Sequence, residues 1–149
     1  MNLKQLNNAL EVQLENLHNY LDAVERQQKA LITINFNELE QSIADQEISL
    51  KLISESEYKT EETIKMFIAN YKLQVNEPAL KNILERLRNV KNDDVKDLFV
   101  KQKEIRDIVQ SILRLNTQNR ILIDHSRNFI KETVAALVNN KKAILDRKI

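Results

Sequence analysis

The stretch that most constrains the fold is the C-terminal part of the chain, where neither Gly nor Pro occurs from Asp93 to Ile149. Between residues 95 and 137, one set of side chains recurs every three or four residues, which places the set on one face of a single helix. That face comprises Val95, Leu98, Gln102, Ile105, Val109, Ile112, Asn116, Asn119, Ile123, Ser126, Ile130, Thr133 and Leu137. At 1.5 Å per residue, the part from Asp93 to Leu137 would be roughly 65 Å long. A helix of this length needs other elements to cover its apolar face, and the rest of the chain is predicted to supply them.

The composition excludes most other fold classes. The 149 residues include no Gly, one Pro and only four Phe and three Tyr, whereas β-rich folds need Gly-bearing hairpin turns and aromatic, β-branched strands. We therefore predict an all-α fold: an elongated antiparallel helical bundle, or coiled coil, of three long helices and one short connecting helix. Residues 1–149 are expected to form one domain, with residues 139–149 fraying at its end.

The expected compartment is the cytoplasm. The chain has no Cys, which excludes disulfides and thiolate metal sites. Glu11 and Glu15 interrupt the segment where a signal peptide would need its apolar core, and no run of about 18 apolar residues is present.

The first 71 residues predict a helical hairpin. A first helix, Leu3–Thr33, has a heptad-like seam: Leu3, Leu6, Leu10, Leu14, Leu17, Leu21, Val24, Gln28 and Leu31. Asn35 can cap a second helix, Phe36–Tyr71, with Glu38 at the capping-box position. Because the connection is so short, the two helices must be antiparallel neighbours.

The buried face of the second helix is expected at Phe36, Leu39, Ile43, Gln46, Leu50, Ile53, Glu57, Ile64, Phe67 or Ile68, and Tyr71. Its middle, residues 54–62, has one apolar residue in nine, so we expect that part to project past the core or to fray. A short helix is predicted from Pro78 to about Val90, with Pro78 in its first turn. Asp93 and Asp94 then complement the N-terminal dipole of the long helix.

Charge is divided between the two halves of the chain. Residues 1–70 hold 6 Lys and Arg against 12 Asp and Glu, whereas residues 71–149 hold 17 against 10. One interpretation is antiparallel packing of oppositely charged helices. The other is a basic C-terminal surface that meets an acidic partner, formed by Arg120, Arg127, Lys131, Lys141, Lys142, Arg147 and Lys148. No stacking aromatics accompany these bases, so nucleic acid is not the expected partner.

Candidate catalytic and metal-binding residues are scarce. Glu15 and His18 have the Glu-x-x-His spacing of di-iron bundle proteins, but those sites need a second copy, and Leu122 stands three residues before His125. A chain without Gly cannot form a phosphate-binding P-loop. We therefore predict that the protein is not an enzyme and needs no metal or other cofactor.

Polar residues on the long helix's apolar face are more informative. Asn116, Asn119 and Ser126 stand where Leu or Ile would cost less to bury. One interpretation is that a buried Asn fixes helix register at some cost in stability. The other is that this part of the helix receives a partner.

The apolar surface here is also broader than one seam. Ile121, Leu122 and Ile123 together cover more than half of the helix circumference, since consecutive residues are about 100° apart. Leu115, Phe129, Ile130, Val134, Leu137 and Val138 continue that surface. Such a helix suggests a groove for another helix.

At these residues the sequence resembles the FlgN family of flagellar export chaperones. The specific match is Leu115-Asn116-x-x-Asn119-x-x-Leu122-Ile123-x-x-Ser126-x-x-Phe129-Ile130, which is close to the family's Asn-x-x-Asn-x-x-Leu-Ile signature. A second match is Glu25-x-x-x-Lys29-Ala30-Leu31 followed by Asn35, Leu39 and Glu47, where the family turns from its first helix into its second.

The resemblance implies a cytosolic, non-enzymatic chaperone with an elongated helical fold. Its clients would be the C-terminal helical segments of hook–filament junction (hook-associated) proteins, which it would keep unpolymerised and deliver to the export gate. The expected client-binding residues are Asn116, Asn119, Leu122, Ile123, Ser126, Phe129, Ile130, Val134, Leu137 and Val138. The alternative is a structural coiled-coil scaffold that self-assembles into a homo-oligomer, because sustained three- and four-residue spacing supports either reading.

Overall fold

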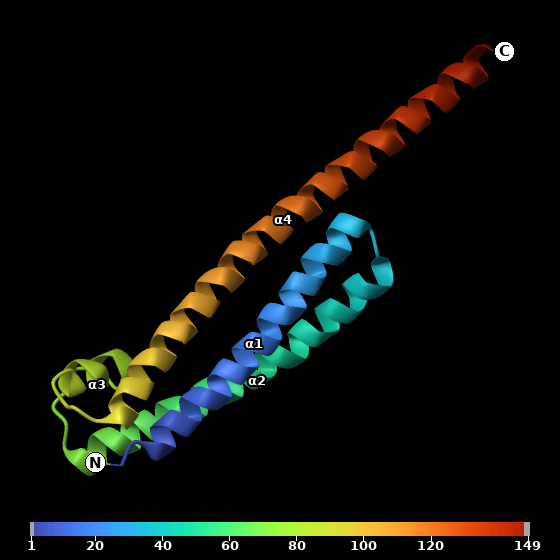
Figure 1. Ribbon diagram of the computed structural model, residues 1–149. Coiled ribbons are helices and arrows are strands. Elements are labelled where there is room, and N and C mark those ends of the chain that lie inside the picture. Colours follow the sequence, from blue (N-terminus) through green and yellow to red (C-terminus); the bar gives the residue numbers. More distant parts are fainter. Residues whose placement is uncertain (1, 148–149) are drawn as a thin grey trace.

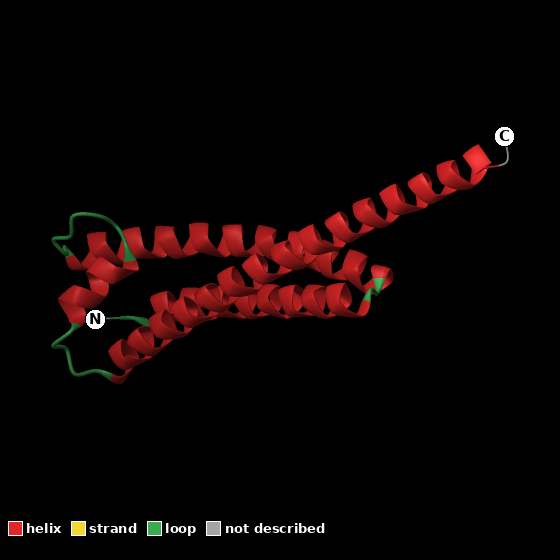
Figure 2. Cartoon of the chain, turned by 90° about the horizontal axis from the view of Figure 1, so that it is seen from above, coloured by secondary structure: helices red, strands yellow, loops and turns green. Residues whose placement is uncertain are grey.

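The computed structural model describes residues 2–147, and these residues form four helices joined by short connections (Figures 1 and 2). They are α1 (Lys4–Thr33), α2 (Phe36–Tyr71), α3 (Leu80–Leu87) and α4 (Asp93–Arg147). The first two form an antiparallel hairpin. Helix α4 runs alongside α1 in the same direction and continues past the end of the hairpin (Figure 1). The predicted all-α, elongated fold is confirmed.

The hairpin turn is made without glycine. Ile34 takes a left-handed conformation, with φ of 54°, after the last residue of α1. Such a conformation is rare in a β-branched residue. The Asn35 N–H donates to the Ala30 carbonyl at 2.9 Å, and the Asn35 side chain accepts from the Glu38 N–H at 3.1 Å. The predicted cap of the second helix is therefore present, and it fixes the hairpin turn.

Helix α1 is the central element, because its side chains reach both other long helices. Near the chain's N-terminus, Leu3, Leu6 and Leu10 pack with residues from α2, α3 and α4, including Phe67, Ile83, Leu84, Leu87, Val95 and Leu98. Further along α1, a second cluster joins Leu14, Leu17, Tyr20 and Val24 to Ile53 of α2 and to Ile108, Ile112 and Leu115 of α4. The hydrophobic core is thus a narrow strip along α1 rather than a globular centre.

The predicted buried face of α2 is wrong at Phe36, Ile43 and Leu50 in its first half. Ile43 and Leu50 are exposed, and the buried positions there are Ser42 and Ser49. Small side chains at a helix contact let the two backbones approach closely, and periodicity could not separate these residues from their larger neighbours. Ser42 donates to the Leu39 carbonyl of its own helix at 2.8 Å, so its burial leaves this hydroxyl paired.

The middle of α2 neither projects past the core nor frays. Ser56 and Thr60 are buried against the rest of the bundle. The Ser56 hydroxyl donates to the Ile53 carbonyl at 2.9 Å, and the Thr60 hydroxyl donates to the Ser56 carbonyl at 2.8 Å. Hydroxyl groups satisfied within their own helix can be buried at little cost, which explains a polar segment that packs.

Two smaller expectations also need correction. Pro78 lies in a bend before α3, which begins at Leu80 and ends at Leu87, so Pro78 is not in the first turn of that helix. On α4, the buried stripe passes through Ile108 and Leu115 instead of the predicted Val109 and Asn116. Each replacement is one residue away, so the stripe is rotated slightly around the helix.

The small-residue contact between α1 and α2 can be tested by a pair of neighbouring substitutions. Ser49→Leu should reduce the free energy of unfolding by about 1–3 kcal/mol, because it forces a large side chain into a closely packed seam. Leu50→Ser should cost less than about 1 kcal/mol, because Leu50 is exposed. Urea denaturation followed by circular dichroism measures both. The reverse order of destabilisation would favour the face that contains Ile43 and Leu50 as the buried one.

Candidate binding groove

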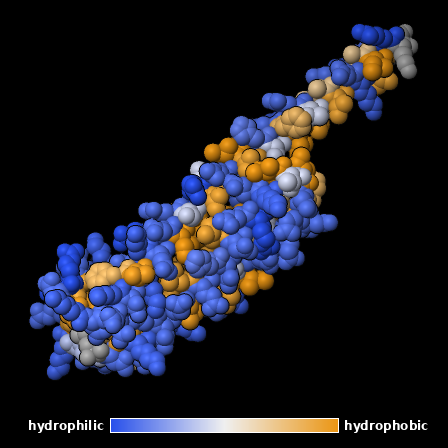
Figure 3. All heavy atoms as spheres, viewed as in Figure 1, coloured by the Kyte–Doolittle hydropathy of each residue, from blue (hydrophilic) through white to orange (hydrophobic). Residues whose placement is uncertain are grey.

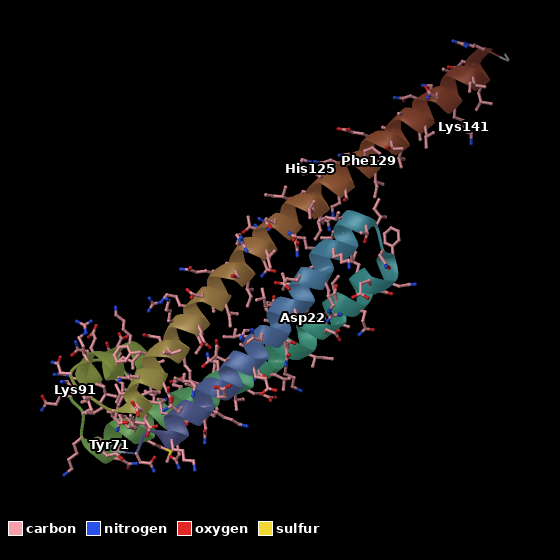
Figure 4. All side chains as sticks on the ribbon, in the orientation of Figure 1. Asp22, Tyr71, Lys91, His125, Phe129 and Lys141 are labelled. Carbon is pink, nitrogen blue, oxygen red and sulfur yellow. The ribbon has the colours of Figure 1, made fainter. Side chains whose placement is uncertain are left out.

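An apolar groove of about 740 Å³ lies where α4 passes the end of the hairpin. The hairpin contributes one wall, formed by residues on both sides of the turn: Gln27, Ala30, Leu31, Ile34, Asn35, Phe36, Leu39 and Ile43. Helix α4 contributes the other wall with Ile123, His125, Ser126, Arg127, Phe129 and Ile130. Figure 4 shows Phe129 on α4 near the level of the hairpin turn.

The groove exists because α1 ends at Thr33 whereas α4 continues to Arg147. Every residue of α4 from Asp124 to Arg147 is exposed. Among them Phe129 is 70% exposed, which is unusual for so large an apolar side chain. Figure 3 shows hydrophobic side chains gathered where α4 leaves the hairpin and continuing along the projecting helix. Contiguous apolar surface of this kind marks interaction sites in soluble proteins.

A polar network closes the buried end of the groove. Asn119 is only 2% exposed, and its Nδ2 donates to the Val24 carbonyl and to Gln27 Oε1, both at 3.2 Å. Gln27 Oε1 also accepts from Gln46 Nε2 at 2.9 Å, so the network joins α4, α1 and α2. The geometry matches a register-fixing asparagine, because the amide group can pair in only one alignment of the helices. Among the described residues, no donor lies within hydrogen-bonding distance of Asn119 Oδ1.

The ten predicted site residues fall into three groups. Asn119 is buried, and Asn116, Leu122 and Ile123 are half-buried next to it. Ser126, Phe129 and Ile130 line the groove, together with Ile123 of the first group. Val134, Leu137 and Val138 lie beyond the groove, on the projecting part of α4.

The hairpin wall of the groove was missed by the sequence reasoning. Ile34 and Phe36 are 72% and 74% exposed, on either side of the capping residue Asn35. Two large apolar residues flanking a tight turn were the available signal, since turns are ordinarily polar. Periodicity assigned Phe36 to the buried face of the second helix and left Ile34 unassigned, because Ile34 lies between the two helices.

Acidic groups surround the hairpin end. Arg26 makes ion pairs with Asp45 at 2.7 Å, Asp22 at 3.2 Å and Glu38 at 3.4 Å. The hydrogen bond to Asp45 is the main cause that raises the pKa of Arg26 above its usual value. The same bond lowers the pKa of Asp45, with a further contribution from Gln41.

On the α4 side of the groove the charges are mostly positive. Arg127 lines the groove, and Lys131, Lys141, Lys142 and Arg147 follow on the projecting helix. The last base of the predicted basic surface, Lys148, lies outside the described residues.

The described part of the chain shows neither a metal-binding cluster nor a membrane-spanning helix. Within residues 2–147, no group of three His, Cys, Asp or Glu side chains is placed to hold a metal ion. Both histidines are exposed, and His125 lines the groove. None of the helices in this part of the chain combines the length and the apolar character needed to cross a membrane.

The fold and the groove define an elongated helical protein with an open apolar surface at the free end of its hairpin. A family model described as FlgN protein matches residues 1–145, and the chain belongs to the FlgN family. It is therefore a chaperone of flagellum assembly and type III protein export. Comparison with curated proteins and with solved structures gave no match.

The role of Asn119 can be tested by two substitutions of similar size. Asn119→Leu should leave the melting temperature unchanged or raise it, because the replacement removes a buried carbonyl oxygen that has no donor. Asn119→Asp should lower it by several degrees at pH 7, because it buries a carboxylate that cannot donate to the Val24 carbonyl. Thermal denaturation of both variants is the measurement. A large loss of stability in Asn119→Leu would mean that the amide stabilises the fold as well as fixing register.

The ion pairs at the hairpin end predict a pH dependence. Since the folded-state pKa of Asp45 is depressed, its contribution to stability is complete above the usual Asp pKa of about 3.9 and is lost as the pH falls through the lower folded value. Asp45→Asn should therefore melt slightly below the parent protein at pH 7, and the difference should shrink toward zero at the acid end. A difference that stays constant from pH 7 to the lowest pH at which both fold would contradict this account.

Proposed function

We propose that this chaperone binds the C-terminal helical segments of hook–filament junction (hook-associated) proteins. Binding would cover the surfaces through which these clients polymerise, and the complex would then deliver them to the export gate at the inner membrane. The protein would act in the cytoplasm without catalysing a reaction. Membership of the FlgN family supports the general role, and the open groove supports a helical client.

The observation that carries this proposal is the continuity between the core and the groove. The face of α4 that packs on α1 through Ile112 and Leu115 continues into the groove as Ile123 and Ile130. A helical client placed there would cover α4 as α1 covers it further down. Helix-in-groove recognition of this kind uses apolar anchors at spacings of three and four residues.

The proposed site combines the α4 residues with the hairpin wall. It includes the half-buried Asn116, Leu122 and Ile123 beside Asn119, the groove residues Ser126, Phe129 and Ile130, and Val134, Leu137 and Val138 further along α4. Burying four or five such apolar side chains would contribute roughly 1.5–3 kcal/mol each before the ordering costs of binding are subtracted. That is enough for a specific complex.

Charged substitutions within the site provide the test. Phe129→Asp combined with Val134→Asp should abolish binding of a peptide from the C-terminus of a junction protein, because two carboxylates would be desolvated in an apolar contact. The free protein should keep its melting temperature, since both side chains are exposed. Val100→Asp with Leu113→Asp is the matched control, because these α4 residues are also exposed but lie outside the groove. Isothermal titration calorimetry compares the two double variants.

Amide hydrogen exchange locates the contact. Residues 123–138 of α4 and residues 30–43 of the hairpin should gain protection when the peptide is added. Equal protection with and without peptide would remove the groove from client binding. A stable homo-oligomer that already protects both segments, and that the peptide does not alter, would favour the scaffold alternative.

A further inference from the structure

We infer that the projecting part of α4, residues 127–147, is a binding site for two antiparallel helices of the client. These client helices would be acidic and would lie in line with the α1–α2 hairpin. This inference rests on the proposed function, since it specifies the form and charge of the client. It extends the contact beyond the groove, along the remaining turns of α4. Residues 127–147 form the α4 extension.

The apolar face of the α4 extension points to the same side as the core. Leu137 follows the buried Asn119 by 18 residues, or about five full turns of a helix with 3.6 residues per turn. Ile130 falls within about 20° of the same line. The hairpin therefore lies on the side of α4 to which the exposed apolar residues of the extension point. These residues continue, without cover, the face of α4 that packs on α1.

That face is wider than the part of α4 that α1 covers. From Ile105 to Asn119, the buried and half-buried apolar side chains lie within about a quarter of the helix circumference. On the extension, the exposed apolar side chains from Phe129 to Val138 spread over about half of it. A single helix packed on the extension as α1 packs on the earlier part of α4 would cover only the middle of this surface. Two helices side by side would cover it.

The position of the hairpin disfavours a flat partner such as a lipid surface. A membrane that touched the apolar face of the extension along its length would have to pass through α1 and α2, because they project from the same side of α4 (Figure 1). Each helix with its side chains is roughly 10 Å thick. Only an object as slender as the hairpin, placed end to end with it, reaches the whole face.

The hairpin turn offers an end surface for such an object. Ile32, Ile34 and Phe36 are all more than 60% exposed at the turn. Ile34 and Phe36 also line the groove, so the end surface and the side surface are continuous. A client hairpin seated on the extension would bury these side chains against its own end.

Charge distinguishes an acidic client from a second copy of the chain. The extension carries five bases and two acids, for a net charge of +3, whereas residues 22–47 at the hairpin end carry six acids and two bases, for −4. A partner that lies along the α4 extension meets this net positive charge and is favoured if it is acidic. Two extensions packed on each other would instead bring +3 against +3.

Site-directed cross-linking tests the number of helices, and the absence of Cys in this chain makes single-cysteine variants straightforward. Ala136 and Val138 flank Leu137, each about 100° around the helix from it, and Asn139 faces away. Ala136→Cys, Val138→Cys and Asn139→Cys, each labelled with a benzophenone, are irradiated with a purified full-length junction protein. Ala136→Cys and Val138→Cys should attach to two client segments separated by a loop, and Asn139→Cys should attach at least about tenfold less.

The outcomes separate this inference from the proposed function. Attachment of both flanking positions to one client segment would mean a single helix, which overturns the inference and leaves the groove proposal intact. Cross-links between two copies of the chain would mean that a second copy, and not the client, occupies the extension. Binding of the extension to phosphatidylglycerol vesicles with no cross-link to the client would mean that lipid does. Either result overturns the inference. Failure of the unlabelled chain to bind the junction protein would remove the proposed function and the inference together.

Charge reversal tests the acidic character. Lys131→Glu, Lys141→Glu and Lys142→Glu together should weaken junction-protein binding about tenfold or more at low salt and remove most of its salt dependence. Lys81→Glu, Lys91→Glu and Lys103→Glu form the matched control, since they change the charge equally at exposed positions outside the extension. Equal effects of the two triple variants would show that only net charge matters and would overturn the inference of an acidic partner.

Discussion

Helix α4 is longer than the hairpin that covers it, and the open surface of the molecule depends on this difference in length. It has 55 residues, against 30 in α1 and 36 in α2. The three long helices lie side by side from the same end of the bundle. Because α4 is the longest, it alone continues past the hairpin turn at Ile34. At 1.5 Å per residue, the 17 residues that follow Ile130 extend roughly 25 Å beyond the groove. Shortening α4 to the hairpin's length would leave an ordinary three-helix bundle without a binding face.

The transition from covered to open surface is marked by a polar residue. On the side of Asn119 toward the N-terminus of α4, the contact between α1 and α4 is mainly apolar, with polar bonds from Asn7 to Asp94 and Lys101 near its far end. On the other side of Asn119, α1 ends within three turns. A seam of leucine and isoleucine alone could slide by one heptad without losing much contact. The bonds from Asn119 to Val24 and Gln27 penalise such a shift, because a displaced amide would be buried without partners. Register matters more here than in a closed bundle, since a slip of α4 would also move Phe129 and Ile130 away from the hairpin wall.

Much of the fold could be predicted because long helices leave a strong periodic signal. The bounds of α2, the asparagine cap at its start and the unbroken course of α4 all follow from local sequence. The packing face of α2 could not be predicted, because Ser42 and Ser49 contribute almost no hydrophobic signal while Ile43 and Leu50 contribute a strong one. Which of two neighbouring faces is buried depends on how closely α1 approaches, and that is a property of the pair of helices. Only the α4 wall of the groove was predicted as a binding surface, because Leu31, Leu39 and Ile43 of the hairpin wall had been assigned to buried faces of their helices.

An exposed helix of about 20 residues would be marginal in water if it had to form alone, because most of the cost lies in nucleating its first turn. In this chain the bundle has already formed that nucleus, so the α4 extension only adds residues to an existing helix. It contains neither Gly nor Pro, and it includes good helix formers such as Ala135, Ala136 and Leu137. The extension can therefore be helical before a partner arrives. A partner that folds on it has only its own chain to order, and this reduces the entropy cost that binding must overcome.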